Sequence, residues 1–307
     1  MRKRWKTALY AAAMAMLLTA CAATEDEIQR VEQEDITPQT RPEKTEAEGE
    51  EPNVSEQVQQ PEEEGGEALE EGGIFETVSN SPVQVSIETD KKEYKDGDRI
   101  LLITNYDDVT VSFEGNEAAS QAVMAEFARR KEEFEERLEL EETLEMAREN
   151  PVVDGSVSYS EENWYTVERN DGRVLSFSAM WDSYEGGAHG QYMIYGVNFD
   201  GTTGKVLTID DVAQDRAAFQ EICVQEMLRQ CEDLKARGVL FDEEMLSAEG
   251  LQEILEGKME GAEWYFTENE IRFISNVYEI APYAAGSIDF DISYEMVNEV
   301  LKEAYRG

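Results

Sequence analysis

The sequence predicts an α+β fold: an antiparallel sheet built from hairpins, with two long helices and short C-terminal helices. Short segments of alternating apolar and polar residues flank turn residues such as Asn170-Asp171-Gly172, a pattern typical of hairpins. Two longer segments, 116–149 and 216–237, repeat their apolar residues at helical spacing. Strands and helices do not alternate regularly along the chain, so we do not expect a doubly wound parallel sheet.

The first 21 residues have the features of an export signal. Four basic residues within the first six precede the apolar run Thr7 to Ala20, which is too short to span a bilayer stably. Leu18-Thr19-Ala20-Cys21 resembles the bacterial lipobox, whose cysteine is diacylglycerated and becomes the new N-terminus. Two acyl chains suffice for stable anchoring. We therefore expect a signal peptide over residues 1–20 and lipidation at Cys21. The alternatives are an ordinary signal with an incidental cysteine, or a retained membrane anchor.

An acidic linker is predicted to follow over residues 21–80. From Thr24 to Gly73 the chain holds 18 acidic and three basic residues, four of its seven prolines and no aromatic residue. Such a segment cannot bury enough apolar surface to offset the entropy of ordering it, so we expect a disordered spacer. It would lift the folded part away from the surface that holds Cys21.

The charge of the chain restricts its partners. With 27 basic and 69 acidic residues, the formal net charge is −42. Nucleic acids and anionic lipids would be repelled, so we expect no nucleic acid and no membrane contact except through the lipid anchor. A cationic partner is favoured instead.

The remaining cysteines, Cys223 and Cys231, lie eight positions apart in a predicted helix. On a continuous helix their Cα atoms would be about 12 Å apart, too far for a disulfide. Two separate buried thiols are therefore expected.

Folded sequence is predicted to begin near Ser81, with a strand at Val83 to Ile87. Two further strands are expected on either side of a turn at Tyr106-Asp107-Asp108. A helix from Asn116 should end at Asn150-Pro151 and bury a narrow stripe of apolar residues. The predicted stripe is Val123, Phe127, Phe134 and Leu138, and the strands predicted next are 164–169, 173–181, 191–199 and 205–209.

The C-terminal part should contain more helix. An amphipathic helix is predicted over 216–237 with Gly238 as its C-cap, and a shorter one after Ser247. A hairpin should pair 264–266 with 271–277, before a strand at 287–292 and a last helix at 294–305.

Catalytic motifs are missing from the sequence. The chain has a single histidine, His189, and no zinc-hydrolase motif, nucleophile elbow, P-loop, dinucleotide-binding motif or calcium-hand loop. We therefore expect no enzyme activity, no metal and no cofactor.

Two loops have unusual compositions. The first, Tyr184-Glu185-Gly186-Gly187-Ala188-His189-Gly190, places three glycines around the only histidine and is expected to need positive φ angles. It either forms a tight connection whose imidazole serves the fold, or faces a ligand with Tyr184 and His189 as polar anchors. The second loop runs from Asn276 to Gly286. Its tyrosines, Tyr278 and Tyr283, either cap the core or anchor an interface.

These loops carry a resemblance to a known family. Tyr184–Gly190, Gly204–Val212 and Tyr278–Gly286 occur in an order similar to the PdaC/RsiV-like pair of domains. The likeness covers about Ser81 to Gly307 and implies a PdaC-type N-terminal α+β domain over 81–200 and a C-terminal α+β domain over 201–307. In this family the pair forms a lysozyme-binding ectodomain of an anti-sigma factor, or precedes a peptidoglycan deacetylase domain. No anti-sigma segment or deacetylase domain is recognisable in this sequence, so neither of those activities is implied.

The sequence thus leads us to expect an extracytoplasmic lipoprotein at the outer face of the cell membrane. Its expected ligand is a cationic muramidase such as lysozyme, or a cell-wall component. The alternatives are a peptidoglycan- or envelope-binding accessory module and a degenerate hydrolase. The residues expected to contact the ligand are Tyr184, Gly186, Gly187, His189, Tyr278, Glu279, Pro282, Tyr283 and Gly286.

Overall fold

A computed structural model describes residues 76–77, 83–150 and 159–307 of the chain. The predicted signal peptide and Cys21 lie outside the described residues, as does the spacer over 24–73. Among the residues that are described, no helix is both long and apolar enough to cross a membrane.

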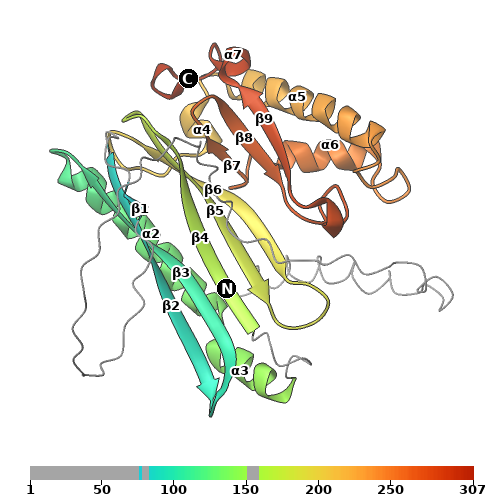
Figure 1. Cartoon of the computed structure of the whole chain (residues 1–307). Helices are drawn as coiled ribbons and strands as arrows, with labels where there is room; N and C mark the ends of the chain where they lie inside the picture. The colour runs from blue at the N-terminus through green and yellow to red at the C-terminus, as the bar shows by residue number, and fades with distance from the viewer. Residues whose placement is uncertain (1–75, 78–82, 151–158) are drawn as a thin grey trace, which may run out of the picture. The chain divides into compact units, whose positions relative to one another are not determined.

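A six-stranded sheet with strand order β1 to β6 forms the N-terminal part (Figure 1). It confirms the α+β class, with hairpins pairing β2 with β3, β4 with β5, and β5 with β6. The turn at Asn170-Asp171-Gly172 joins β4 to β5 as predicted, with Gly172 at φ 80°. The strands are β1 (Glu76–Thr77), β2 (Val83–Asp96), β3 (Arg99–Phe113), β4 (Tyr159–Asn170), β5 (Val174–Tyr184) and β6 (Gln191–Asp200).

The turn predicted at Tyr106–Asp108 is wrong, because β3 runs unbroken through it. Asp107 is almost fully buried. Its carboxylate accepts the Thr89 hydroxyl at 2.7 Å and the Tyr165 backbone N–H at 3.0 Å. A buried carboxylate with two donors is stable inside a sheet, and tertiary contacts therefore override the turn preference of the sequence.

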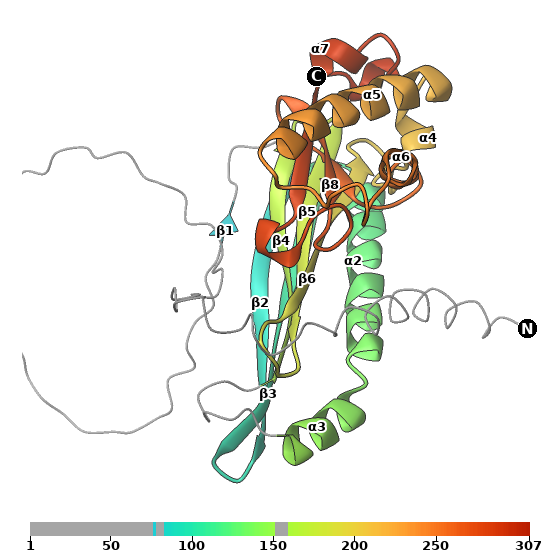
Figure 2. The ribbon, with the colours of Figure 1, turned by 90° about the vertical axis from the view of Figure 1, so that its right-hand side faces the viewer.

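One pair of neighbouring strands is parallel, β3 with β4, and two helices connect them. The helix predicted over 116–149 divides into α2 (Glu117–Arg137) and α3 (Leu140–Glu149). The helix is interrupted at Glu139, because its left-handed φ of 42° cannot continue a right-handed helix. Asn116 and Asn150 cap the two ends as expected. Figure 2 shows α2 lying along one face of the sheet.

The α2 side chains form the core of this layer. The predicted stripe is buried: Val123, Phe127, Phe134 and Leu138 are each at most 8% exposed. Phe127 packs edge-on against Tyr165 and Phe177, with ring centroids 5.0 and 5.1 Å apart. Edge-to-face pairs of this kind add about 0.5–1.5 kcal/mol each beyond the burial of their area.

The C-terminal part packs four α-helices and a small antiparallel sheet, β7-β8-β9, around a second core (Figure 1). The two longer helices and the hairpin agree with the sequence. The elements are α4 (Ile209–Val212), α5 (Arg216–Ala236), α6 (Ala248–Gly257), β7 (Trp264–Phe266), β8 (Glu270–Ser275), η2 (Tyr283–Ala285), β9 (Ile288–Ser293), α7 (Tyr294–Val297) and η3 (Glu303–Tyr305).

Two predicted C-terminal elements are wrong. The strand over 205–209 is reduced to a single bridge between Phe199 and Val206. Thr208 and Asp211 form a capping box, which starts α4 instead. The last helix stops at Val297 because the chain then pairs with residues 212–214, as in the bridge between Ala213 and Leu301.

The thiols of Cys223 and Cys231 are free and buried on α5, as the helical spacing predicts. Burial raises the pKa of both thiols, that of Cys231 to about 11. They pack as small hydrophobic groups rather than as reactive thiolates.

Buried polar contacts fix the C-terminal part against the large sheet. Asn198 of β6 donates to the Trp264 carbonyl at 3.0 Å, and the Phe266 N–H donates to Ser176 Oγ at 3.0 Å. The buried guanidinium of Arg169 donates to the Tyr294 hydroxyl at 2.6 Å. As a result, the end of the large sheet that carries the β5–β6 turn lies beside the loop that follows β8, which begins at Asn276.

Candidate functional site

The two loops singled out in the sequence meet in space. The imidazole of His189 stacks on the Tyr283 ring, with centroids 4.0 Å apart and planes 18° apart. Its Nε2 lies 3.4 Å from the Tyr278 hydroxyl, and Tyr278 lies 5.6 Å from Tyr283 between ring centroids. Tyr192 of β6 completes the group, edge-on to Tyr283 at 6.1 Å. We call His189, Tyr192, Tyr278 and Tyr283 the aromatic cluster.

The aromatic cluster is open to solvent. Tyr278 is 49% exposed and His189 is exposed, whereas Tyr192 and Tyr283 are half-buried. An exposed group of three tyrosines and a histidine is a typical interface anchor, because each ring presents a large rigid area at a small cost in side-chain entropy.

Two glycines allow the β5–β6 loop to present His189. Gly186 and Gly187 have φ angles of 92° and 99°, as their composition predicts. The Tyr184 hydroxyl donates to the Gly187 carbonyl at 3.1 Å and closes the turn. His189 Nδ1 lies 2.8 Å from the Gly190 carbonyl, which fixes the ring orientation. Tyr184, Gly186 and Gly187 thus shape the loop, and His189 is the member that reaches the aromatic cluster.

The carboxylate of Glu279 stabilises the second loop by accepting three hydrogen bonds beneath it. Its Oε2 accepts the Lys258 ammonium at 2.6 Å, the Asn276 backbone N–H at 2.7 Å and the Ser275 hydroxyl at 2.9 Å. Lys258 is 4% exposed, so this carboxylate balances a buried charge. These contacts place Glu279 under the loop rather than at its outer surface.

The same turn gives Tyr278 an unusual backbone. Its φ is 67°, one of two positive values outside glycine in the described part of the chain. The left-handed conformation disfavours a residue with a bulky side chain, and here it directs the ring outward to His189.

Hydrogen bonds to β6 hold the rest of the loop. Asn276 bridges to β6, accepting the Ile194 N–H at 2.7 Å and donating to the Ile194 carbonyl at 3.1 Å. The Tyr192 hydroxyl accepts the Ser287 N–H at 3.0 Å. A Cβ at Gly286 would lie 3.3 Å from this hydroxyl, which favours glycine there. Pro282 is exposed and precedes the short helix η2, in which Tyr283 is the first residue.

Two carboxylates lie beside the aromatic cluster. Asp182 of β5 is the direct cross-strand neighbour of Tyr192, and Glu162 of β4 is the neighbour of Asp182. Burial, reinforced by Glu162 and Glu161, raises the pKa of Asp182 to about 6. Burial also raises the pKa of Tyr283, and the charge of Asp182 contributes to that increase. Asp182 and Tyr192 were not predicted as site residues, because only the register of β5 against β6 places them side by side.

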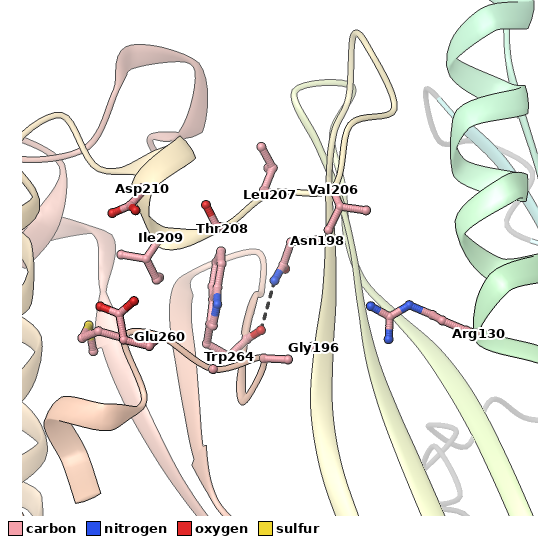
Figure 3. A pocket seen from close by; sticks show the side chains of 13 residues that line it. Arg130, Gly196, Asn198, Val206, Leu207, Thr208, Ile209, Asp210, Glu260 and Trp264 are labelled. Carbon is pink, nitrogen blue, oxygen red and sulfur yellow. Dashed lines mark hydrogen bonds between the residues drawn. The ribbon is translucent and has the colours of Figure 1, made fainter. Parts of the chain in front are cut away.

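A recess of about 250 Å³ lies farther along β6 than Tyr192, where Arg130 of α2 points toward Gly196 (Figure 3). Its charged groups are already paired. Arg130 Nε donates to Glu126 at 2.8 Å, while Arg216 contacts Asp210 at 3.0 Å and Glu260 at 2.6 Å. The aromatic cluster is therefore the stronger candidate for a binding site.

The described residues show how side chains that could bind a metal are grouped, and the contacts of His189 show what orients its ring. Within 83–150 and 159–307, no group of three or more His, Cys, Asp or Glu side chains is arranged to hold a metal ion. The ring nitrogens of His189 contact a carbonyl and a tyrosine hydroxyl, neither of which is the carboxylate that commonly orients a catalytic histidine.

Comparison with known proteins finds that the C-terminal region is similar to the DUF3298 domain. Residues 210–295 match the family model of that name, a protein family of unknown function. The matched range includes the loop over 278–286, while the β5–β6 loop precedes it. A search of curated proteins finds no significant match.

The chain is also similar to two crystal structures of DUF3298 proteins. One, from Bacteroides fragilis, is 18% identical with a TM-score of 0.46, over 72% of this chain and 94% of that one. The other, from Pseudomonas aeruginosa, is 17% identical with a TM-score of 0.45, over 75% of this chain and 98% of that one.

Proposed function

We propose that this chain is a lipid-anchored extracytoplasmic protein of the PdaC/RsiV-like type that binds a basic protein through the aromatic cluster. The observation that carries the proposal is the stacking of His189 on Tyr283. It joins two loops of unusual composition into one exposed aromatic surface. The leading candidate partner is a cationic muramidase such as lysozyme.

Charge supports a basic partner. The net charge of −42 attracts a cationic protein over long range, which speeds association and weakens as salt screens the field. Attraction of this kind is unspecific, so selectivity must come from shaped contacts. Tyr283 and Pro282, at the start of η2, are the proposed anchors, with Tyr278 and His189 beside them.

The proposed location follows from the N-terminal sequence. Cys21 after Leu18-Thr19-Ala20 would attach the protein to the outer face of the cell membrane. A spacer of about 50 residues would reach roughly 40 Å as a flexible coil, and further when its like charges repel. The aromatic cluster could then meet a soluble partner arriving from outside.

The test is a titration of the full chain with lysozyme at low and moderate salt, comparing wild type with Tyr283→Ala. Loss of a central tyrosine anchor typically costs about 2 kcal/mol, so we expect a roughly thirtyfold weaker affinity. Tyr94→Ala is the control, since it removes a tyrosine from β2 and should bind as wild type does. Binding that disappears at moderate salt and is unaffected by Tyr283→Ala would reduce the effect to unspecific charge attraction.

A peptidoglycan ligand is the second candidate, because Trp164 lies on the same sheet face as Tyr192. Trp164 is two positions along β4 from Glu162, which is in register with Asp182 and Tyr192. Trp181 points to the other face, where it packs under Arg137 and donates to Glu161 at 2.5 Å. Soluble peptidoglycan fragments that bind wild type independently of salt, and lose affinity in Trp164→Ala, would favour this alternative.

A further inference from the structure

A row of polar side chains crosses the sheet beside the aromatic cluster. Strand register places Asn105, Glu162, Asp182 and Tyr192 next to one another on β3, β4, β5 and β6. Adjacent members of such a row have Cβ atoms about 4.5–5.5 Å apart and share one face of the sheet.

The row lies on the face opposite α2. Trp181 and Tyr195 contact Arg137 and Arg130 of α2, at 5.4 and 5.6 Å. Successive side chains of a strand point to opposite faces, so Asp182 points away from α2. Figure 2 shows α2 on one side of the sheet only.

Asp182 differs from Glu162 and Glu279 in having no counter-charge within the described part of the chain. Glu279 is paired with Lys258, and Glu162 is hydrogen-bonded by Asn105 and lies within the field of Lys91. For Asp182, no hydrogen bond or ion pair is found among the described residues, although the side chain is half-buried. The charges that act on it, Glu162 and Glu161, are both negative. A partly desolvated carboxylate in this position would gain most from a cation.

The aromatic rings beside Asp182 would also favour a cation. Tyr192 is its direct neighbour, and Tyr283 lies edge-on to Tyr192 at 6.1 Å with planes 68° apart. Ring faces attract ammonium and guanidinium groups, and a carboxylate adds a charge-assisted hydrogen bond. The aliphatic part of a lysine or arginine side chain could lie against the rings.

We propose that Asp182, Glu162, Tyr192 and Tyr283 form a receptor for one basic side chain of the protein partner, with arginine favoured over lysine. Arginine is favoured because its planar guanidinium stacks on aromatic rings while its N–H groups bind a carboxylate. The assignment to a protein partner rests on the proposed function. The receptor itself rests on the register of β4, β5 and β6, and on Asp182 having no counter-charge among the described residues. The occupant is a cation because the net charge of −42 and the carboxylate pair both repel anions.

The first experiment measures the receptor without any protein partner. His189 is the only histidine in the chain, so in untagged protein its imidazole protons give an isolated NMR signal from a ring stacked on Tyr283. The probes are Nα-acetyl-arginine amide and its neutral isostere, Nα-acetyl-citrulline amide. We expect a saturable shift of the His189 signal with the arginine probe, at roughly millimolar concentration, and at least tenfold weaker binding of the citrulline probe.

Variants identify the carboxylate. Asp182→Asn should weaken binding of the arginine probe at least tenfold, since it removes the charge and keeps the shape. Asp98→Asn, in the exposed turn between β2 and β3, makes the same change of charge at a distance and should bind as wild type does. Equal shifts with the two probes, or equal binding by the two variants, would overturn the proposal.

The same variants separate this inference from the proposed function. Lysozyme that binds wild type and Asp182→Asn with equal affinity would refute the receptor and leave the proposed function standing. Specific binding of the arginine probe without any binding of lysozyme would support the receptor and refute lysozyme as the partner. If both proposals hold, Asp182→Asn weakens lysozyme binding at least tenfold relative to Asp98→Asn at the same salt concentration.

Discussion

The imidazole of His189 and the phenol ring of Tyr283 lie stacked, 4.0 Å apart between centroids. One ring comes from the loop between β5 and β6, the other from the loop between β8 and β9. His189 lies in a connection between two strands, and Tyr283 begins the three-residue helix η2, so neither segment holds its ring in place alone. The stack therefore depends on contacts beneath it, chiefly those of Asn276 and Glu279, and these contacts can be tested separately from binding.

Tyr278 is expected to be unfavourable for stability and favourable for binding. Its φ of 67° suits glycine, so Tyr278→Gly should leave the free energy of unfolding unchanged or raise it by up to about 1 kcal/mol. Tyr278→Val also removes the ring but keeps a β-branched side chain at positive φ, and should lower the free energy of unfolding by about 1–2 kcal/mol. Urea unfolding measures both variants. Equal stability would mean that the turn relaxes without strain.

Asn276 is expected to hold the second loop to the sheet. Asn276→Ala would leave the Ile194 N–H and carbonyl without their partners, at a cost of about 2 kcal/mol in the free energy of unfolding. Hydrogen exchange at the Ile194 amide should become faster. Asn269→Ala, in the exposed turn between β7 and β8, is the control and should change neither quantity. Unchanged protection at Ile194 would show that the loop is held by other contacts.

Asp182 should lower stability at neutral pH. Its pKa of about 6 in the folded chain exceeds the value of 3.8 for an unperturbed side chain, because burial and the neighbouring Glu162 and Glu161 disfavour its charge. The folded state thus binds more protons between these values, so this contribution to stability falls as pH rises from about 4 to above 6. Allowing for solvent screening, Asp182→Asn should raise the free energy of unfolding by about 1 kcal/mol at pH 7 and by little at pH 4.

Urea unfolding of wild type and Asp182→Asn at both pH values checks this sign. Asp98→Asn serves as the control for a general change in net charge. A variant less stable than wild type at pH 7 would mean that Asp182 has a stabilising partner in the folded protein.

The two thiols of α5 are expected to remain unpaired. Denatured, unreduced protein is expected to react with an alkylating agent at both Cys223 and Cys231, as counted by mass spectrometry. An intramolecular disulfide between them would require α5 to break, because a continuous helix holds their Cα atoms about 12 Å apart.

The proposed lipid anchor is tested by Cys21→Ala. We expect an unprocessed precursor and a protein without acyl chains, released from the membrane fraction. Mass spectrometry of the wild-type protein should find acylated Cys21 at its N-terminus. An unmodified Cys21 in the mature protein would contradict the assignment.

Regular local patterns predicted most of the secondary structure. The turn at Asn170-Asp171-Gly172, the helix α5 with Gly238 after it, and the start of α6 at Ser247 all agree with the structure. The errors occur where distant contacts override local preference. Asp107 has turn chemistry but is held inside β3 by Thr89 and Tyr165, which are distant in the sequence.

By itself the sequence determined the α+β class and most helices and strands, because periodicity, capping and turn residues act over a few neighbouring positions. It also singled out both loops of the candidate site by their glycines, tyrosines and lone histidine. Only the tertiary structure decided that His189 stacks on Tyr283, that Glu279 lies under its loop, and that Asp182 lies beside Tyr192. Those relationships depend on strand register and on how the C-terminal part packs against β6, and both arise from contacts between residues far apart in the chain.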